Sequence, residues 1–160
     1  MYKIKIKKGW WPWKRQQLAV KALDFAIKHY ELQNECEIYP VKLILTKFKD
    51  NYYGDSWMHE WGYEIRINSR FNDYRMIRTI FHEMTHVKQF ALGELKLGTK
   101  VDKFKGKKYK REDYWNAPWE VEARKAEKKM MRKWKKVLDI PTPRAAPRNS
   151  LAFFSRMAAK

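Results

Sequence analysis

The chain has 160 residues and 44% hydrophobic residues, which suits a single domain with a buried core. Its lone cysteine, Cys36, excludes an intramolecular disulfide and a cysteine-rich zinc ribbon. No apolar run approaches the roughly 20 residues of a membrane span, and the basic start lacks the apolar stretch of a signal peptide. We therefore expect a cytoplasmic protein with no membrane partner.

The charge is strongly positive, with 36 Lys and Arg against 18 Asp and Glu and a formal net charge of +18. The excess is concentrated at residues 3–8, 96–111 and 124–136. A basic surface of this kind either is simply solvated or attracts a polyanion, either nucleic acid or an acidic protein. No sequence-reading motif decides between these alternatives.

The first elements differ in their hydrophobic period. Residues 1–9 alternate between apolar and basic side chains, which predicts a short strand or an extended arm. From Pro12, a helix is predicted over residues 13–33, because apolar side chains recur at helical spacing; they are Leu18, Ala22, Phe25, His29 and Leu32.

Residues 37–68 are predicted to be β structure. Three runs, around 41–46, 51–59 and 62–68, are separated by turn-forming residues, which favours an antiparallel meander. We expect a small sheet that is either antiparallel or mixed.

The rest of the chain predicts two more helices. Asn72 can cap the first, and Gly93 can end it. Residues 93–115 show no period and are predicted to form a long basic loop, after which Pro118 opens a helix to about residue 138. We expect a domain at residues 1–140 and a proline-containing tail at 141–160.

Residues 82–86 read His-Glu-Met-Thr-His, the HExxH pattern. Residues four apart project from the same helix face, so His82 and His86 can bind one zinc ion. Glu83 lies beside the metal and can act as the base that deprotonates water. The three residues lie off the apolar stripe of the predicted helix. The pattern indicates a zinc site with Glu83 as the catalytic residue.

The spacing of residues alone does not identify the third metal ligand. No histidine follows His86, and His59, upstream on a strand or turn, would be an atypical ligand. A ligand belongs on a rigid element packed against the first helix. This favours the acidic residues at the start of the last helix, Glu120 and Glu122. Glu127, further along, either hydrogen-bonds one of the histidines or pairs with lysines.

The segments HEMTHVKQ at 82–89 and YWNAPWEVEA at 114–123 together resemble the small SprT-like metallopeptidases encoded by bacteriophages, and the HExxH-plus-Glu arrangement is that of gluzincins. The resemblance implies a minimal zincin-like α+β fold, bound Zn²⁺, and a phage or bacterial origin. If the protein is phage-encoded, its location would be the host cytoplasm or the virion. In gluzincins a small residue follows the ligand Glu by three positions. The resemblance therefore implies Glu120, with Ala123 after it, as the third ligand and Glu122 as the alternative.

Together these features predict a zinc-dependent endopeptidase that acts on a protein or peptide. Tyr114, just before the ligand helix, is the first candidate to stabilise the oxyanion, ahead of His59, Tyr63 and the Lys and Arg residues of 96–111. Residues 63–67 are predicted to be the edge strand on which a peptide substrate lies. The alternative is a basic nucleic-acid-associated or virion protein whose metallopeptidase fold is mainly structural.

Overall fold

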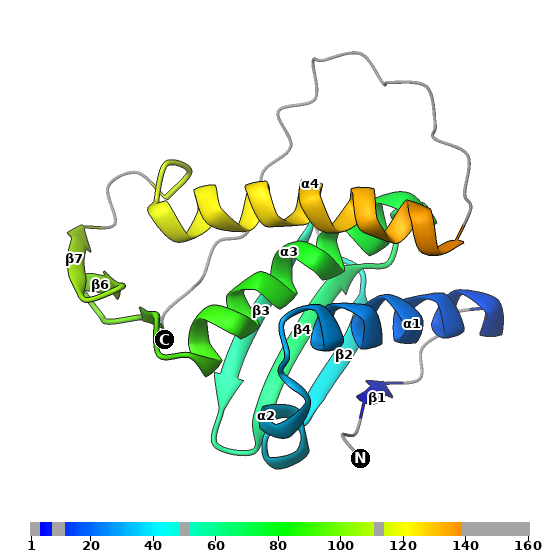
Figure 1. Cartoon of the computed structure of the whole chain (residues 1–160), viewed down its shortest axis with the longest axis horizontal. Helices are drawn as coiled ribbons and strands as arrows, with labels where there is room; N and C mark the ends of the chain where they lie inside the picture. Colours follow the sequence, from blue (N-terminus) through cyan, green and yellow to red (C-terminus); the bar gives the residue numbers. More distant parts are fainter. Residues whose placement is uncertain (1–3, 8–11, 49–51, 111–113, 139–160) are drawn as a thin grey trace.

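The computed structural model describes residues 4–7, 12–48, 52–110 and 114–138, so the predicted tail at 141–160 lies outside the described residues. The described chain is an α+β fold, as predicted (Figure 1). Its helices are α1 (Trp13–His29), α2 (Gln33–Ile38), α3 (Asp73–Ala91) and α4 (Pro118–Leu138). Its larger sheet comprises β1 (Ile4–Lys7), β2 (Val41–Thr46), β3 (Gly54–His59) and β4 (Gly62–Asn68), and its smaller one β5 (Leu95–Lys96), β6 (Val101–Phe104) and β7 (Lys107–Lys110).

The larger sheet is mixed, with strand order β1-β2-β4-β3. β2 pairs in parallel with both β1 and β4, and only β3 runs antiparallel to its neighbour. Of the two predicted sheet types the mixed one is present, and the antiparallel meander is wrong, because β2 pairs with β4 rather than with β3. The physical reason is that β2 and β4 carry the apolar side chains that face the helices, such as Leu43 and Ile65, which are directly paired in the register and fully buried.

This strand order also corrects the predicted edge strand. Residues 63–67 belong to β4, which has β2 on one side and β3 on the other. A substrate peptide therefore has no open edge to pair with there. Within the described part of the chain, the edge strand on this side of the sheet is β3.

The helices lie on one face of the larger sheet (Figure 1). α1 and α3 pack across the strands, and α4 lies along α3. A single hydrophobic cluster joins these layers; it includes Leu23 and Ile27 of α1, Ile65 of β4, Ile80 and Met84 of α3, and Met130 and Trp134 of α4. Among the described helices, none has the length and apolarity needed to cross a membrane.

The ends of α3 are those the sequence predicts. The Asn72 side chain accepts a hydrogen bond from the backbone N–H of Arg75 at 2.9 Å, which satisfies one of the free donors at the helix start. After the helix, Gly93 has φ of +65°, a conformation that favours glycine.

Two other predicted segments differ in detail. The first helix ends at His29 rather than residue 33, because Glu31 takes a positive φ of 57°. The short α2 then continues to Ile38, so β structure starts at Val41 and not at residue 37.

The predicted loop at 93–115 is wrong for its central part, which forms the smaller sheet. Leu95 and Phe104 are buried there, and they pack with Ala117 and Trp119 in a second hydrophobic cluster. Many lysines separate Leu95 from Phe104, so the segment shows no apolar period from which strands could be predicted. The cluster fixes the small sheet against the start of α4.

Candidate metal centre

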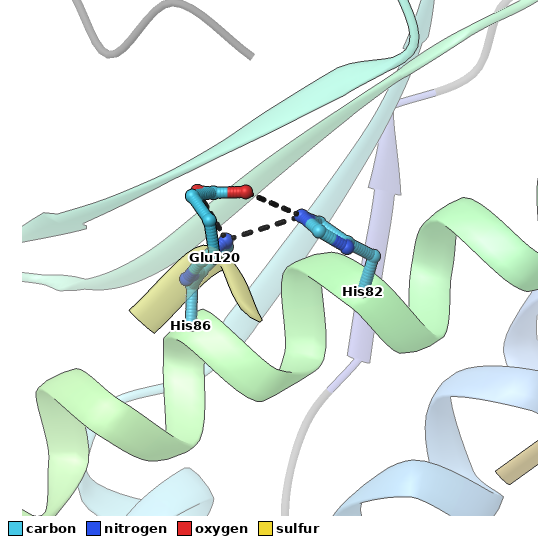
Figure 2. A group of neighbouring side chains, drawn as sticks. All are labelled: His82, His86 and Glu120. Atoms are coloured by element: carbon cyan, nitrogen blue, oxygen red, sulfur yellow. Dashed lines mark hydrogen bonds and ion pairs between the residues drawn. The ribbon is translucent and has the colours of Figure 1, made fainter. Parts of the chain in front are cut away.

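Three potential metal ligands meet between α3 and α4. His82 and His86 come from α3, and Glu120 comes from the first turn of α4 (Figure 2). The Nε2 atoms of the two histidines are 3.3 Å apart. Glu120 Oε2 lies 3.2 Å from His82 Nε2, and Glu120 Oε1 lies 3.1 Å from His86 Nε2. All three side chains are completely buried, and they form a group that could hold a metal ion.

Burial of α3 extends beyond its apolar stripe. The site residues lie off the apolar stripe of α3, yet His82, Glu83 and His86 are as buried as the stripe itself. On the polar side of α3, Glu120 of α4 contacts the two histidines, and Ser56 of β3 contacts Glu83. Most buried polar groups in proteins have hydrogen-bond partners, and the partners of this face are described below.

His86 is oriented by a chain of hydrogen bonds. The Gln89 side-chain Nε2 donates to the backbone carbonyl of Trp119 at 3.2 Å, so its Oε1 is the atom left to face the histidine. That oxygen lies 2.9 Å from His86 Nδ1 and can only accept, so Nδ1 carries the proton. Gln89 thus links α3 to the start of α4 and directs Nε2 of His86 toward Glu120.

His82 is oriented in a similar way, by a carboxylate that contacts its Nδ1. Its Nδ1 lies 3.2 Å from Glu127 Oε2, one of the two contacts predicted for that residue. Glu127 is fully buried, and Arg78 donates to its Oε1 through Nε at 2.7 Å. A carboxylate behind a histidine fixes the ring and makes its other nitrogen a better ligand.

The two imidazoles therefore direct their Nε2 atoms at the same point. Two neutral nitrogens with facing lone pairs at 3.3 Å repel each other unless a positive charge lies between them. Tetrahedral zinc with bonds of about 2.0–2.1 Å separates its ligand atoms by about 3.3 Å. The 3.1–3.3 Å separations at this site fit that requirement.

The electrostatics of the site also favour a cation. Burial lowers the pKa of His82, but its hydrogen bonds to Glu120 and Glu127 outweigh burial and raise the pKa to about 10. Burial likewise opposes the charge of Glu120, yet the two histidines hold the pKa of this carboxyl well below its usual range. The carboxylates thus stabilise positive charge at the imidazoles, which either protons or a metal ion can supply.

Glu83 projects beside this group without belonging to it. Ser56 of β3 donates a hydrogen bond to Glu83 Oε2 at 2.9 Å, and both side chains are buried. The other oxygen, Oε1, is buried and has no hydrogen-bond partner within the described residues. Burial raises the pKa of Glu83 to about 7, against the opposing effect of the histidines and Ser56. A carboxyl group of this kind can both take up and return a proton near neutral pH.

The edge strand reaches Glu83 because Gly54 allows a close approach to α3. A Cβ atom at Gly54 would lie 2.6 Å from the Arg66 carbonyl oxygen and 2.9 Å from Cγ2 of Thr79. A larger residue would push β3 away from the helix that carries Glu83. The approach at Gly54 therefore supports the Ser56 contact.

The other predicted residues lie around the site in different roles. Tyr114 is close to it, but its hydroxyl donates to Glu120 Oε1 at 2.5 Å. Glu122 points elsewhere and pairs with Lys105 at 2.5 Å and Lys88 at 3.4 Å. His59 is exposed at the end of β3, where it stacks on Trp61.

Tyr63 is buried within β4 and donates to Glu35 at 2.7 Å, so it does not face the metal centre. The structure thus brings Glu120, and not Glu122 or His59, together with the two histidines. The role of Tyr114 in stabilising an oxyanion stays a prediction.

Sequence reasoning missed three residues that shape the site: Ser56, Arg78 and Gln89. Gln89 is one helical turn after His86, so its spacing could have revealed it. Arg78 likewise lies one turn before His82. Ser56 carries no such signal, because its contact depends on how β3 packs against α3.

Comparison with protein-family models, with curated proteins and with solved structures gives no significant match. Function must therefore be argued from the chemistry of this site.

Proposed function

We propose that this protein is a zinc-dependent endopeptidase. The observation that carries the proposal is the buried group of His82, His86 and Glu120, with the Glu83 carboxyl beside it. This combination provides metal ligands and a proton acceptor in one buried site.

The donor set favours zinc over harder cations. Calcium and magnesium prefer oxygen ligands alone, whereas two imidazole nitrogens and one carboxylate oxygen suit zinc. Three protein ligands are also the number found at catalytic zinc sites, where a position is kept for water or substrate. Zinc bound there supplies Lewis acidity, which polarises a carbonyl and activates water.

The chain's own residues supply the proton transfers. Glu83 accepts the proton of the attacking water and returns it to the amine of the leaving peptide. Ser56 acts as a positioning residue, because its hydroxyl holds one oxygen of Glu83 and leaves the other for water. Gln89, Glu127 and Arg78 position the two imidazoles.

An extended peptide is the substrate class that suits this geometry. Within the described residues β3 is paired only with β4, so its other edge can add a substrate strand. Ser56 lies on the same strand, so a peptide paired with β3 runs past Glu83. This proposal moves the substrate strand from residues 63–67 to β3.

The test is proteolysis by wild type and by Glu83→Gln, with an unfolded protein such as casein and with zinc present. We expect Glu83→Gln to lose about 10²–10⁴-fold in rate, because a general base is removed, and to keep its zinc. Glu122→Gln is the matched control, since it makes the same change outside the site, and it should remain active. If zinc-loaded wild type leaves casein intact, or if Glu83→Gln cleaves it normally, the proposal is wrong.

A further inference from the structure

The outer face of α4 carries a row of cations whose charge nothing in the described chain balances. Five exposed residues form this row, which we call the α4 ridge: Lys125, Lys128, Lys129, Arg132 and Lys136. With about 3.6 residues per turn, they fall within a stripe about 100° wide and about 16 Å long. The ridge lies on the side of the helix opposite Glu120, Glu127 and Trp134.

The acidic residues of α4 all contact side chains outside the α4 ridge. Glu120 contacts the histidines, Glu127 binds Arg78 and His82, and Glu122 pairs with Lys88 and Lys105. In the described residues no acidic side chain forms an ion pair with a member of the α4 ridge. The helix therefore separates its charges, with carboxylates inside and cations outside.

The cations beside the ridge differ from those in it. Arg124 lies over the Trp115 ring, Lys133 contacts His29, and Lys135 lies over Tyr74. Residues 139–160 add no excess of negative charge, because they contain Asp139 alone against four basic residues. Like charges one turn apart on a helix repel each other. Repulsion within the row therefore destabilises the helix locally, and a bound anion would relieve that repulsion.

We propose that the α4 ridge binds the phosphate backbone of a nucleic acid duplex. A row of lysines about one helical turn apart matches a regular line of phosphates, which lysine and arginine contact without reading sequence. The composition argues against a protein partner, because protein interfaces are depleted in lysine and enriched in aromatic residues. A membrane surface also fits poorly, since the apolar face of α4 is buried in the core and cannot enter lipid.

This binding would leave the metal centre unobstructed. The ridge and Glu120 are on opposite sides of α4, which lies along α3 on the outside of the helical layer (Figure 1). The binding itself requires neither metal nor catalysis, so it can be tested separately from peptidase activity.

The experiment compares two full-length variants that each remove four positive charges. The ridge variant carries Lys125→Gln, Lys128→Gln, Lys129→Gln and Arg132→Gln. The control variant carries the same change at four exposed cations on other elements: Lys14, Lys47, Arg70 and Lys100. Glutamine is a helix former close to lysine, so both variants should fold, which circular dichroism and thermal unfolding would verify.

Binding to a labelled duplex of about 30 base pairs would be measured by fluorescence anisotropy over a range of salt concentrations. We expect the ridge variant to bind at least tenfold more weakly than wild type and the control variant to stay within about threefold. The slope of log K against log salt should fall by about 3–4 in the ridge variant, because each lost phosphate contact contributes about 0.9.

Three results would overturn the proposal. The first is wild type that does not bind the duplex at about 50 mM salt, where phosphate contacts are strong. The second is an equal loss in both variants, which would assign binding to net charge alone. The third is displacement by polyglutamate at the same charge concentration as by unlabelled duplex, which would indicate an acidic protein partner.

Discussion

The two faces of α4 differ in how their charges are balanced. On the inner face Glu120 and Glu127 are 0% exposed, and each is held by histidine or arginine. On the outer face the α4 ridge is exposed and has no acidic partner among the described residues. Burying a carboxylate is costly unless it is paired, whereas a solvated lysine costs little. Substitutions on the inner face should therefore break a specific pair, whereas the outer face tolerates substitution and is free to bind a partner.

Metal binding should produce the largest effect on the inner face. The proposed site would bind zinc when folded, whereas the unfolded chain would bind it weakly, so free zinc at 1,000 times Kd should add about 4 kcal/mol to the free energy of unfolding. His86→Ala should abolish most of this gain. Denaturant unfolding with zinc and with a chelator would measure it. An equal gain in wild type and His86→Ala would place the zinc elsewhere.

The adjacent residues Glu127 and Lys128 offer a direct comparison of the two faces. Glu127→Gln weakens the hold on His82 Nδ1, so zinc affinity should fall about 10–100-fold. Lys128→Gln changes a neighbouring exposed residue and should leave zinc affinity unchanged. Competition with a fluorescent zinc chelator would measure both affinities. Similar losses in the two variants would contradict the division into faces.

Ser56 provides a smaller test, through pH. Its hydrogen bond to the charged form lowers the pKa of Glu83, so Ser56→Ala should raise that pKa. Glu83 must be deprotonated to act as a base, so the acid limb of the rate–pH profile should move to higher pH, by up to about 1 unit.

At a pH below that limb the Ser56→Ala variant should be slower than wild type. Ser56→Thr keeps the hydroxyl and should restore the wild-type profile. An unchanged profile in Ser56→Ala would show that the hydroxyl does not act through Glu83.

The smallest effect is expected for a single ridge substitution. Arg132→Gln should change the free energy of unfolding by no more than about 0.5 kcal/mol, since Arg132 is exposed and has no acidic partner in the described chain. Urea unfolding would measure it. A loss above 2 kcal/mol would mean that the ridge supports the fold.

Features set by local chemistry could be predicted from the sequence. The cap at Asn72, the stop at Gly93 and the start of α4 at Pro118 depend on neighbouring residues, and all three are present. The i, i+4 spacing of His82 and His86 likewise follows from helix geometry alone.

Features set by non-local packing could not be predicted from the sequence. The pairing of β2 with β4 depends on which strands share the core, and sequence order suggested β3 instead. The small sheet at 95–110 consists of strands too short and too rich in lysine to show a period. The Ser56 contact to Glu83 similarly joins two residues 27 positions apart.

The choice between Glu120 and Glu122 is the most direct test of the metal centre. The measurement is zinc content per chain in purified wild type, Glu120→Ala and Glu122→Ala, after dialysis against a weak chelator. We predict bound zinc in wild type and Glu122→Ala and its loss in Glu120→Ala, because only Glu120 contacts both histidines. Zinc retained in Glu120→Ala, or lost only in Glu122→Ala, would contradict the site described above.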